Sequence, residues 1–199
     1  MKKPALFILA AGASSRMGVP KQLLSFKNNT LLGTVIQHCK AAEVDNIYCI
    51  LGANAAKIET SHQNLGINFI KNDEYRNGLS SSIRKAIEFI LEIDPAIPSI
   101  LFLLGDQPYI TEAHIRKYIK LHKEHPSKVI ATAYGKGNGV PALFPNNHFS
   151  RLLQLQGDSG AKYLLETFTD KILVQLPQEN LTDIDTKEEY LNSLKGYNK

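Results

Sequence analysis

An apolar run that passes directly into a loop of small residues, at residues 6–24, sets the strongest limit on how this chain folds. Residues 5–10 predict a buried strand, and residues 11–15 predict a loop at its carboxyl end. Open α/β sheets bind their ligands in the crevice at the carboxyl ends of the strands. Gly12 and Gly18 permit a close approach that a Cβ would block. The segment therefore predicts a ligand-binding loop at one edge of a sheet.

Two cations in the same segment indicate that the ligand is an anion. Arg16 can hold phosphate oxygens with its planar guanidinium, and Lys21 adds a compact positive charge. Residues 1–42 contain six Lys or Arg side chains and no Asp or Glu. Neither the P-loop spacing nor the G-x-G-x-x-G fingerprint is present. The segment favours a triphosphate cradle, and the simpler alternative is a glycine turn between two elements.

Length and composition indicate one soluble domain that spans residues 1–199. Apolar residues make up 43% of the chain and charged residues 21%, which is ordinary for a globular protein. The net charge of +4 is mild and no basic run marks a nucleic-acid surface, so we expect no nucleic-acid partner. No apolar stretch is long enough for a transmembrane helix, so we expect no membrane partner. Cys39 and Cys49 are expected to be buried free thiols, which fits the reducing cytoplasm.

Strand and helix patterns alternate along the chain. Expected strands lie at residues 5–10, 46–51, 67–70, 100–104 and 129–133. Expected helices lie at residues 30–42, 55–62, 78–93 and 111–122, with N-caps expected at residues 80–82 and at Thr111. This alternation predicts an α/β fold of Rossmann-like type, a single domain with a mostly parallel sheet and helices on both faces.

Asp106 is the first candidate metal ligand. It follows the apolar run 100–104 and Gly105, so its carboxylate is expected in the crevice at the carboxyl end of a central strand. Such a group can hold Mg²⁺, which takes oxygen ligands and keeps phosphates as partners. The alternative is an Asp that only stabilises its own turn.

Asp183 and Asp185 precede a predicted final helix. Thr186 and Glu189 have the spacing of a capping box, so the helix is expected to start at this point. The two aspartates are therefore either ligands of a site or acids that favour a helix N-terminus.

Two further stretches carry small and polar residues at expected element boundaries. Residues 77–84 place three serines and Arg84 at a helix start, which suits an anionic or polar ligand and also suits ordinary capping. Residues 137–144 and 157–161 have two interpretations as well. They form part of a substrate site, or they are a β-turn before an edge strand and a turn that opens a helix.

No arrangement in the sequence favours covalent or histidine-based metal chemistry. The serines of the first loop have no nearby base candidate, and no histidine pair has a metal-ligand spacing. The six histidines are expected to be solvated, and they are His38, His62, His114, His122, His125 and His148.

The motif L-A-A-G-x-S-x-R-M-G-x-x-K-x-L-L, at residues 9–24, resembles the signature of the molybdopterin nucleotidyltransferase family. The molybdenum cofactor cytidylyltransferase branch is the most similar, and the resemblance continues over nearly the whole chain. It implies the nucleotide-diphospho-sugar transferase type of α/β fold. The implied reaction is attack of a terminal phosphate of molybdopterin on the α-phosphate of a nucleoside triphosphate, with release of pyrophosphate.

The resemblance also implies roles for individual residues. Arg16, Lys21 and Asp106 would be catalytic, and Asp106 and Asp185 would bind Mg²⁺, for which Mn²⁺ can substitute. The implied nucleotide-binding residues are Leu9, Ala10, Ala11, Gly12, Ala13, Ser14, Ser15, Arg16, Lys21, Asn77, Gly78, Ser80 and Ser82. The implied residues on the side of the phosphate acceptor are Gln107, Pro108, Asn138, Gly139, Pro141, Asp158 and Gly160.

Ala11 bears on the choice of nucleotide. Cytidylyltransferases of the family tend to have L-A-A-G where related guanylyltransferases have L-A-G-G, so the resemblance favours CTP over GTP. Family members often have His where Asn138 stands, a departure that bears on fine recognition of the acceptor. The resemblance further implies transient contact with a molybdoenzyme or its chaperone.

Three alternatives stay open at this point. One is a nucleotidyltransferase with a sugar or polyol phosphate as the acceptor. Another is a non-catalytic protein that binds and delivers molybdenum cofactor. The third is a nicotinamide-dependent oxidoreductase, which the missing glycine fingerprint disfavours.

Overall fold

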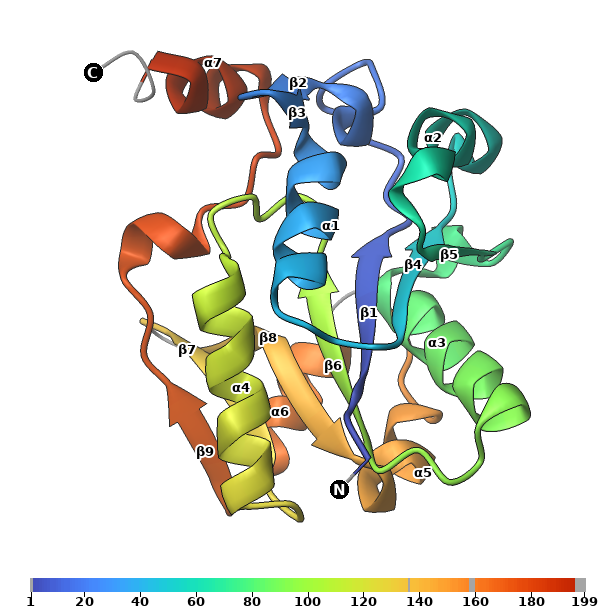
Figure 1. Ribbon diagram of the computed structural model, residues 1–199, viewed down its shortest axis with the longest axis vertical. Coiled ribbons are helices and arrows are strands. Elements are labelled where there is room, and N and C mark those ends of the chain that lie inside the picture. Colours follow the sequence, from blue (N-terminus) through green and yellow to red (C-terminus); the bar gives the residue numbers. More distant parts are fainter. Residues whose placement is uncertain (1, 136, 158–159, 196–199) are drawn as a thin grey trace.

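A seven-stranded sheet forms the centre of the protein, seen here in a computed structural model that describes residues 2–135, 137–157 and 160–195 (Figure 1). The strand order is β5-β4-β1-β6-β8-β7-β9. The strands are β1 (Ala5–Ala10), β4 (Ile47–Leu51), β5 (Asn68–Lys71), β6 (Ser99–Leu104), β7 (Val129–Tyr134), β8 (Gly137–Pro145) and β9 (Lys171–Val174). A separate two-stranded hairpin joins β2 (Ser25–Phe26) to β3 (Asn29–Thr30).

The sheet has a parallel half and a mixed half. Strands β5, β4, β1 and β6 run parallel to one another, whereas β8 is antiparallel to both of its neighbours, β6 and β7. The edge strand β9 is parallel to β7. The mostly parallel sheet expected from the sequence is confirmed. Residues 137–144 do form a strand, but it lies inside the sheet rather than at the edge.

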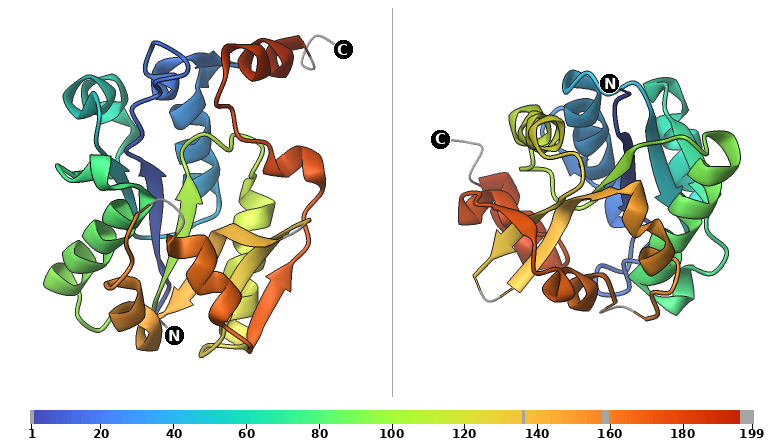
Figure 2. Two further views of the ribbon diagram at one scale, coloured as in Figure 1. Left: turned by 180° about the vertical axis from the view of Figure 1, so that it is seen from behind. Right: turned by 90° about the horizontal axis from the view of Figure 1, so that it is seen from below.

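Helices cover both faces of the sheet (Figures 1 and 2). Helices α1 (Leu31–Ala41), α2 (Ala55–His62) and α4 (Glu112–Glu124) pack on one face, and α3 (Leu79–Ile93), α5 (Phe149–Leu152) and α6 (Gly160–Thr167) pack on the other. Alternate residues of β1 enter the two apolar clusters, Phe7 on the side of α3 and Ile8 on the side of α1. Because both faces are covered, the strands read as continuous apolar runs.

The helix starts differ in one respect from the sequence-based prediction. Thr30 caps α1 by accepting a hydrogen bond from the Gly33 amide, and Thr111 caps α4. The expected cap for α3 at residues 80–82 is wrong, because Gly78 occupies the cap position and the serines lie in the buried first turn. Gly78 has φ +85, a conformation that favours glycine at this boundary.

The last described helix, α7 (Lys187–Lys195), lies beside the β2–β3 hairpin at the carboxyl end of the parallel strands (Figure 1). Its predicted capping box is present, because Thr186 Oγ1 accepts from the Glu189 amide while Glu189 Oε2 accepts from the Thr186 amide. In the described part of the chain, no helix has the length and apolar character needed to cross a bilayer.

Candidate active site

The loop after β1 is held in place by a glutamine from the 3₁₀ turn that follows it. The turn spans Lys21–Leu23, and Gln22 Nε2 donates to Ala10 O at 2.9 Å and to Gly12 O at 3.1 Å. The Gln22 side chain is buried, so these bonds are shielded from water. Ser14 Oγ accepts from the Lys21 amide at 3.1 Å and closes the loop from the other side. The backbone of the loop is therefore fixed before any ligand binds.

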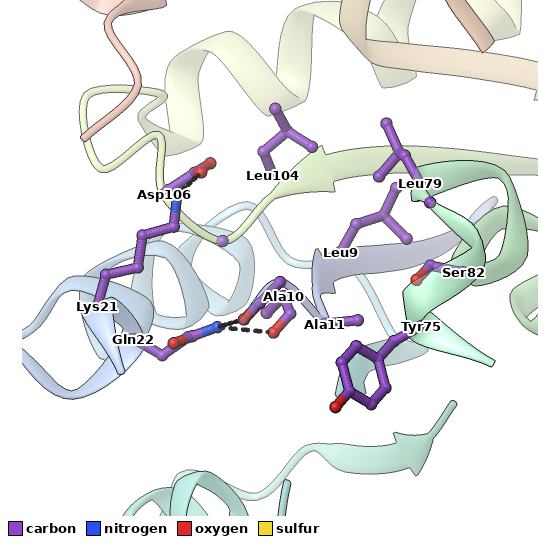
Figure 3. A pocket seen from close by; sticks show the side chains of 13 residues that line it. Leu9, Ala10, Ala11, Lys21, Gln22, Tyr75, Leu79, Ser82, Leu104 and Asp106 are labelled. Atoms are coloured by element: carbon purple, nitrogen blue, oxygen red, sulfur yellow. Dashed lines mark hydrogen bonds and ion pairs between the residues drawn. The ribbon is translucent and has the colours of Figure 1, made fainter. Parts of the chain in front are cut away.

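A cavity of about 220 Å³, here called the first cavity, opens at this loop (Figure 3). Its wall is apolar along Leu9, Leu79 and Leu104, and Lys21 and Asp106 approach each other at one end. The full lining is Leu9, Ala10, Ala11, Gly12, Lys21, Gln22, Tyr75, Gly78, Leu79, Ser82, Leu104, Gly105 and Asp106.

Gly52, directly after β4, sets how close the Tyr75 side chain comes to the first cavity. A Cβ on Gly52 would lie 2.5 Å from Tyr75 Cβ and 2.6 Å from Ala11 O, too close for any side chain. Ala11 O cannot easily move away, because it accepts a hydrogen bond from the Ala53 amide at 3.2 Å. The missing side chain at Gly52 thus allows the Tyr75 ring to form part of the cavity wall beside Ala11 (Figure 3).

Three charged side chains from distant parts of the sequence meet at the mouth of the first cavity. Lys21 Nζ donates to Asp106 Oδ2 and, at 2.5 Å, to Asp185 Oδ1. Arg16 lies further out, with Nη1 at 3.6 Å from Asp185 Oδ2 and most of its side chain exposed. Asp185 is held near Asp106 by the backbone, because the Ile184 amide donates to Asp106 O at 3.1 Å. We call Lys21, Asp106 and Asp185 the ion cluster.

The charges of the ion cluster reinforce one another. Burial opposes the charged form of Lys21, but Asp106 and Asp185 outweigh it and raise the pKa of Lys21 above its usual value. Burial likewise opposes ionisation of Asp185, yet its bond to Lys21 lowers the pKa of Asp185. At Asp183, burial and the nearby Asp106 outweigh the hydrogen bond from Gln107 and the charge of Lys21, and they raise the pKa of Asp183 to about 6.

The carboxylates of the ion cluster fit a divalent cation that also binds phosphate. Asp106 Oδ1 is buried and has no hydrogen-bond partner among the described residues, so one ligand position is free. The described residues contain no group of three or more His, Cys, Asp and Glu side chains arranged around a common metal position. Mg²⁺ needs only one or two protein carboxylates when substrate phosphates supply further ligands. The site therefore suits a metal that arrives with a nucleotide.

A second cavity of about 420 Å³ adjoins the first and shares the side chains of Leu79 and Leu104 with it. Its polar groups include Gln107 and Tyr134, and Gln107 Nε2 donates to Tyr134 Oη at 2.9 Å and to Asp183 Oδ1 at 2.7 Å. The full lining is Leu79, Leu104, Gln107, Tyr134, Gly137, Asn138, Gly139, Val140, Lys162, Leu165 and Asp183. Burial raises the pKa of Tyr134 to about 12, so its phenol is neutral at physiological pH.

Most of the residues expected at the nucleotide site lie at the first cavity, but several do not. Ala13, Ser15 and Arg16 are exposed on the loop, and Ser14 acts through its bonds within the loop. Ser82 lines the cavity, whereas Ser80 is fully buried and is not among the lining side chains.

Some of the expected acceptor-side residues line the second cavity and others do not. Gln107, Asn138 and Gly139 line the second cavity, whereas Pro108 and Pro141 are buried beside it and do not appear in its lining. Asp158 lies outside the described residues, and Gly160 begins α6.

Two further expected residues lie on a different surface. Asn77 and Arg84 line a third cavity with residues 153–157, and Arg84 Nη1 donates to Leu155 O at 2.5 Å. Arg84 is therefore engaged with the backbone of that loop rather than with the first cavity.

Sequence reasoning missed Gln22, Gly52, Tyr75 and Tyr134. Gln22 stands inside the recognised motif, at a position that the motif leaves variable, so only its burial would have marked it. Gly52 follows a predicted strand end, which is the one local signal that was available.

Comparisons with known proteins agree with this geometry. The chain is 25% identical to the purine catabolism protein PucB of Bacillus subtilis, covering 96% of each chain. It is 26% identical to the molybdenum cofactor cytidylyltransferase of Escherichia coli, covering 96% of this chain and 95% of the relative. Rv0371c of Mycobacterium tuberculosis has a similar structure, with a TM-score of 0.81 and 26% identity over 98% of both chains. Rv0371c has also been crystallised in complex with manganese, and that structure matches with a TM-score of 0.78.

The chain has the nucleotide-diphospho-sugar transferase fold, which nucleotidyltransferases among the similar solved structures share. Within this class, the chain belongs to the MobA-like NTP transferase family, whose sequence model matches residues 6–176. The resemblance seen in the sequence alone is thereby confirmed. Asp183 and Asp185 lie beyond the matched range, so the structure, rather than the family match, joins them to the site.

Proposed function

We propose that the protein transfers CMP from CTP to the terminal phosphate of molybdopterin or molybdenum cofactor and releases pyrophosphate. The observation that carries the proposal is the pair of adjoining cavities, which share Leu79 and Leu104 and have the ion cluster at the mouth of the first. Two substrates that react with each other need neighbouring sites and a charged group at the point where they meet. The first cavity would hold the nucleotide and the second cavity the acceptor.

The residues of the ion cluster would stabilise charge rather than move protons. A phosphate nucleophile is already ionised at neutral pH, so no strong protein base is needed. Lys21, whose raised pKa keeps it protonated, would bind the phosphate oxygens that gain charge as pyrophosphate departs. Arg16 is exposed and can turn toward the outer phosphates, and the fixed loop backbone would orient the triphosphate.

Asp106 and Asp185 would hold Mg²⁺, with Mn²⁺ as a substitute. When bound there, the ion would neutralise phosphate charge and polarise the phosphorus–oxygen bonds of the nucleotide. The manganese complex of the structurally similar Rv0371c supports divalent metal binding at this site. Lys21, now between the two carboxylates, would be freed to contact phosphate when a divalent cation takes its place.

Ala11 supports CTP as the nucleotide. Its side chain lines the first cavity next to Tyr75, and the methyl group narrows the space left for a base. A pyrimidine needs less width there than a purine. The similarity to the Escherichia coli molybdenum cofactor cytidylyltransferase supports the same choice.

The wider setting is part of the proposal. We infer one catalytic domain over residues 1–199 that works in the cytoplasm, where buried free thiols such as Cys39 and Cys49 stay reduced. The product would be handed to a molybdoenzyme or its chaperone by transient contact.

Pyrophosphate release tests the proposal directly. Purified protein is mixed with Mg²⁺ and purified molybdopterin cofactor, and CTP, GTP, ATP and UTP are supplied in parallel. Release with CTP is the expected result, and a preference for GTP would overturn the choice of nucleotide. If no nucleotide gives release while CTP still binds in a thermal-shift assay, the proposed acceptor is wrong, and sugar and polyol phosphates are tested next.

A further inference from the structure

Lys162 places an uncompensated positive charge at the wall of the second cavity. It lies in the first turn of α6 and lines the cavity, and it has no hydrogen bond or ion pair among the described residues. No other Lys or Arg side chain belongs to the described lining of this cavity. The charge of Lys162 is therefore available to a ligand that enters the cavity.

The absence of a side chain at Gly137 lets Lys162 lie close to the backbone of β8. A Cβ on Gly137 would lie 3.1 Å from Lys162 Cε and 3.7 Å from Lys162 Nζ. Gly137 itself lines the second cavity. A lysine can lay its aliphatic stem on a surface while its ammonium group stays accessible. The ammonium group of Lys162, and not only its stem, thus lies at the cavity wall.

Glu166, one turn further along α6, does not neutralise Lys162. Residues four positions apart on a helix can form an ion pair, and Glu166 Oε1 would lie 3.7 Å from the same added Cβ on Gly137. The two described side chains nevertheless form no ion pair, and Glu166 is not in the lining of the second cavity. An anionic ligand in the cavity would therefore meet the ammonium group rather than the carboxylate.

Lys162 and the ion cluster belong to different parts of the site. Gly137, next to Lys162, pairs with Tyr134 of β7, whereas the ion cluster lies beyond the ends of β1 and β6. Gln107 connects the two parts, because its Nε2 donates to Tyr134 Oη at 2.9 Å and to Asp183 Oδ1 at 2.7 Å. The attacking phosphate of the acceptor would lie at the ion cluster, so Lys162 would meet another part of the acceptor.

Much of the remaining wall of the second cavity cannot bind a charge. Its aliphatic side chains are Leu79, Leu104, Val140 and Leu165. An apolar part of the acceptor can pack on these side chains, whereas a charged group placed against them without a partner costs free energy. A negative charge on this part of the acceptor therefore needs Lys162.

We propose that Lys162 is a binding residue for a second anionic group of the acceptor, apart from the phosphate that attacks the nucleotide, and that the charged oxygens of this group accept hydrogen bonds from the ammonium group. This inference rests on the proposed function, because it treats the second cavity as the acceptor site. It deepens that function by stating that the acceptor carries negative charge at two places.

The test measures binding without nucleotide transfer, by calorimetric titration at low salt. One probe is 6-(phosphonooxy)hexanoate, in which a flexible chain joins a phosphate to a carboxylate. The other is 6-(phosphonooxy)hexanamide, which has nearly the same shape but lacks the second charge. We expect the wild-type protein to bind the carboxylate about threefold to tenfold more tightly, a range between exposed and buried charged contacts. Equal binding, tighter binding of the amide, or no binding of either probe would overturn the inference.

Variants show whether Lys162 causes the preference for the carboxylate. In Lys162→Met the preference should disappear, whereas Lys162→Arg should keep it because the positive charge is retained. A preference that persists in Lys162→Met, or that is lost equally in Lys162→Arg, would contradict the role of the charge. Lys57→Met, on exposed α2 surface across the sheet, lowers the net charge equally and is the matched control. If Lys57→Met reduces the preference as much, only overall charge is responsible and the inference is wrong.

The readouts distinguish this inference from the proposed function. CTP affinity and melting temperature, measured on every variant, show whether the fold and the first cavity are intact. If pyrophosphate release with CTP is observed but Lys162→Met leaves the preference unchanged, the inference is wrong and the proposed function stands. If the preference depends on Lys162 but no nucleotide supports release, the anion site stands and the transfer reaction is wrong.

Discussion

The two cavities differ in what fixes their polar groups. One wall of the first cavity is a continuous stretch, from Leu9 to Gly12, whose backbone is held by Gln22. The second cavity depends on side chains far apart in sequence, because Gln107 contacts Tyr134 across 27 positions and Asp183 across 76. A backbone cradle tolerates changes of side chain, whereas a side-chain network depends on each of its members. Substitutions near the second cavity should therefore alter its shape more readily than substitutions near the first.

Removing Asp106 should have the largest effect, because it tests the ion cluster at the mouth of the first cavity. We expect Asp106→Ala to lower turnover by at least about 100-fold, comparable to losing one preorganised charge-stabilising group. Melting temperature should change far less than turnover, since Lys21 keeps its bond to Asp185 and the substitution also removes a buried oxygen that has no hydrogen-bond partner among the described residues. Steady-state pyrophosphate release checks the effect, with Asp170→Ala on the surface as the matched control. A folded Asp106→Ala protein with near-normal turnover would exclude the role.

A side chain at Gly52 should damage the first cavity alone. In Gly52→Ala, the new Cβ collides with Tyr75 and with Ala11 O, so we expect a loss of about 1–3 kcal/mol in the free energy of unfolding. Displacing the cavity wall should also raise KM for the nucleotide about tenfold. KM for the acceptor should stay the same. If both KM values rise together, the two cavities are not independent.

Gly139→Ala is the counterpart on the side of the acceptor, and its expected effect is smaller. The three atoms nearest to the new Cβ belong to the Tyr134 ring, with Cε2 at 2.8 Å, and a side chain can shift more easily than a backbone carbonyl. We expect KM for the acceptor to rise roughly threefold to tenfold with KM for the nucleotide unchanged. The same kinetic assay checks this, with Gly52→Ala as the reciprocal control. A rise in nucleotide KM would contradict the separation.

His122 tests a region that belongs to neither cavity. Its Nε2 lies 2.9 Å from Ser99 Oγ, at the start of β6 and away from the ion cluster, and burial lowers the pKa of His122. The unfolded state then binds the proton more readily, so stability is fully present above about pH 6.5 and falls as the pH drops below it.

Melting curves between pH 5.5 and 7.5, where histidine titrates, check this expectation. The fall in melting temperature on acidification should be smaller for His122→Asn than for the wild-type protein, and kinetics at neutral pH should be unaffected. Exposed His125→Asn serves as the control. If acidification lowers the melting temperature of His122→Asn by as much as that of the wild-type protein, His122 does not contribute to acid sensitivity.

The parallel half of the fold was predictable because its signals are local. The continuous apolar run of β1 and the helical spacing of α1 each appear within about a dozen residues. The interior position of β8 was not predictable, because Gly137, Asn138 and Gly139 look like a turn in isolation. Only the pairing of β8 with both β6 and β7 turns them into a strand.

The candidate site also has a part that the local sequence predicted and a part that it did not. The motif at residues 9–24 led to the first cavity, and a carboxylate after an apolar strand led to Asp106. The Gln107–Tyr134 contact leaves no trace in sequence spacing, because it depends on how β7 lies relative to β6. The engagement of Arg84 with Leu155 O was hidden for the same reason.

The ion cluster also has a consequence for protein synthesis. Lys21 is paired with Asp106 across 85 positions and with Asp185 across 164. The ribosome synthesises the chain from its amino terminus. Strand β1 and the loop after it therefore leave the ribosome long before Asp185 does. A nascent chain that has formed its parallel strands still lacks the second carboxylate around Lys21. The timing of translation therefore separates the appearance of the loop after β1 from the completion of the ion cluster.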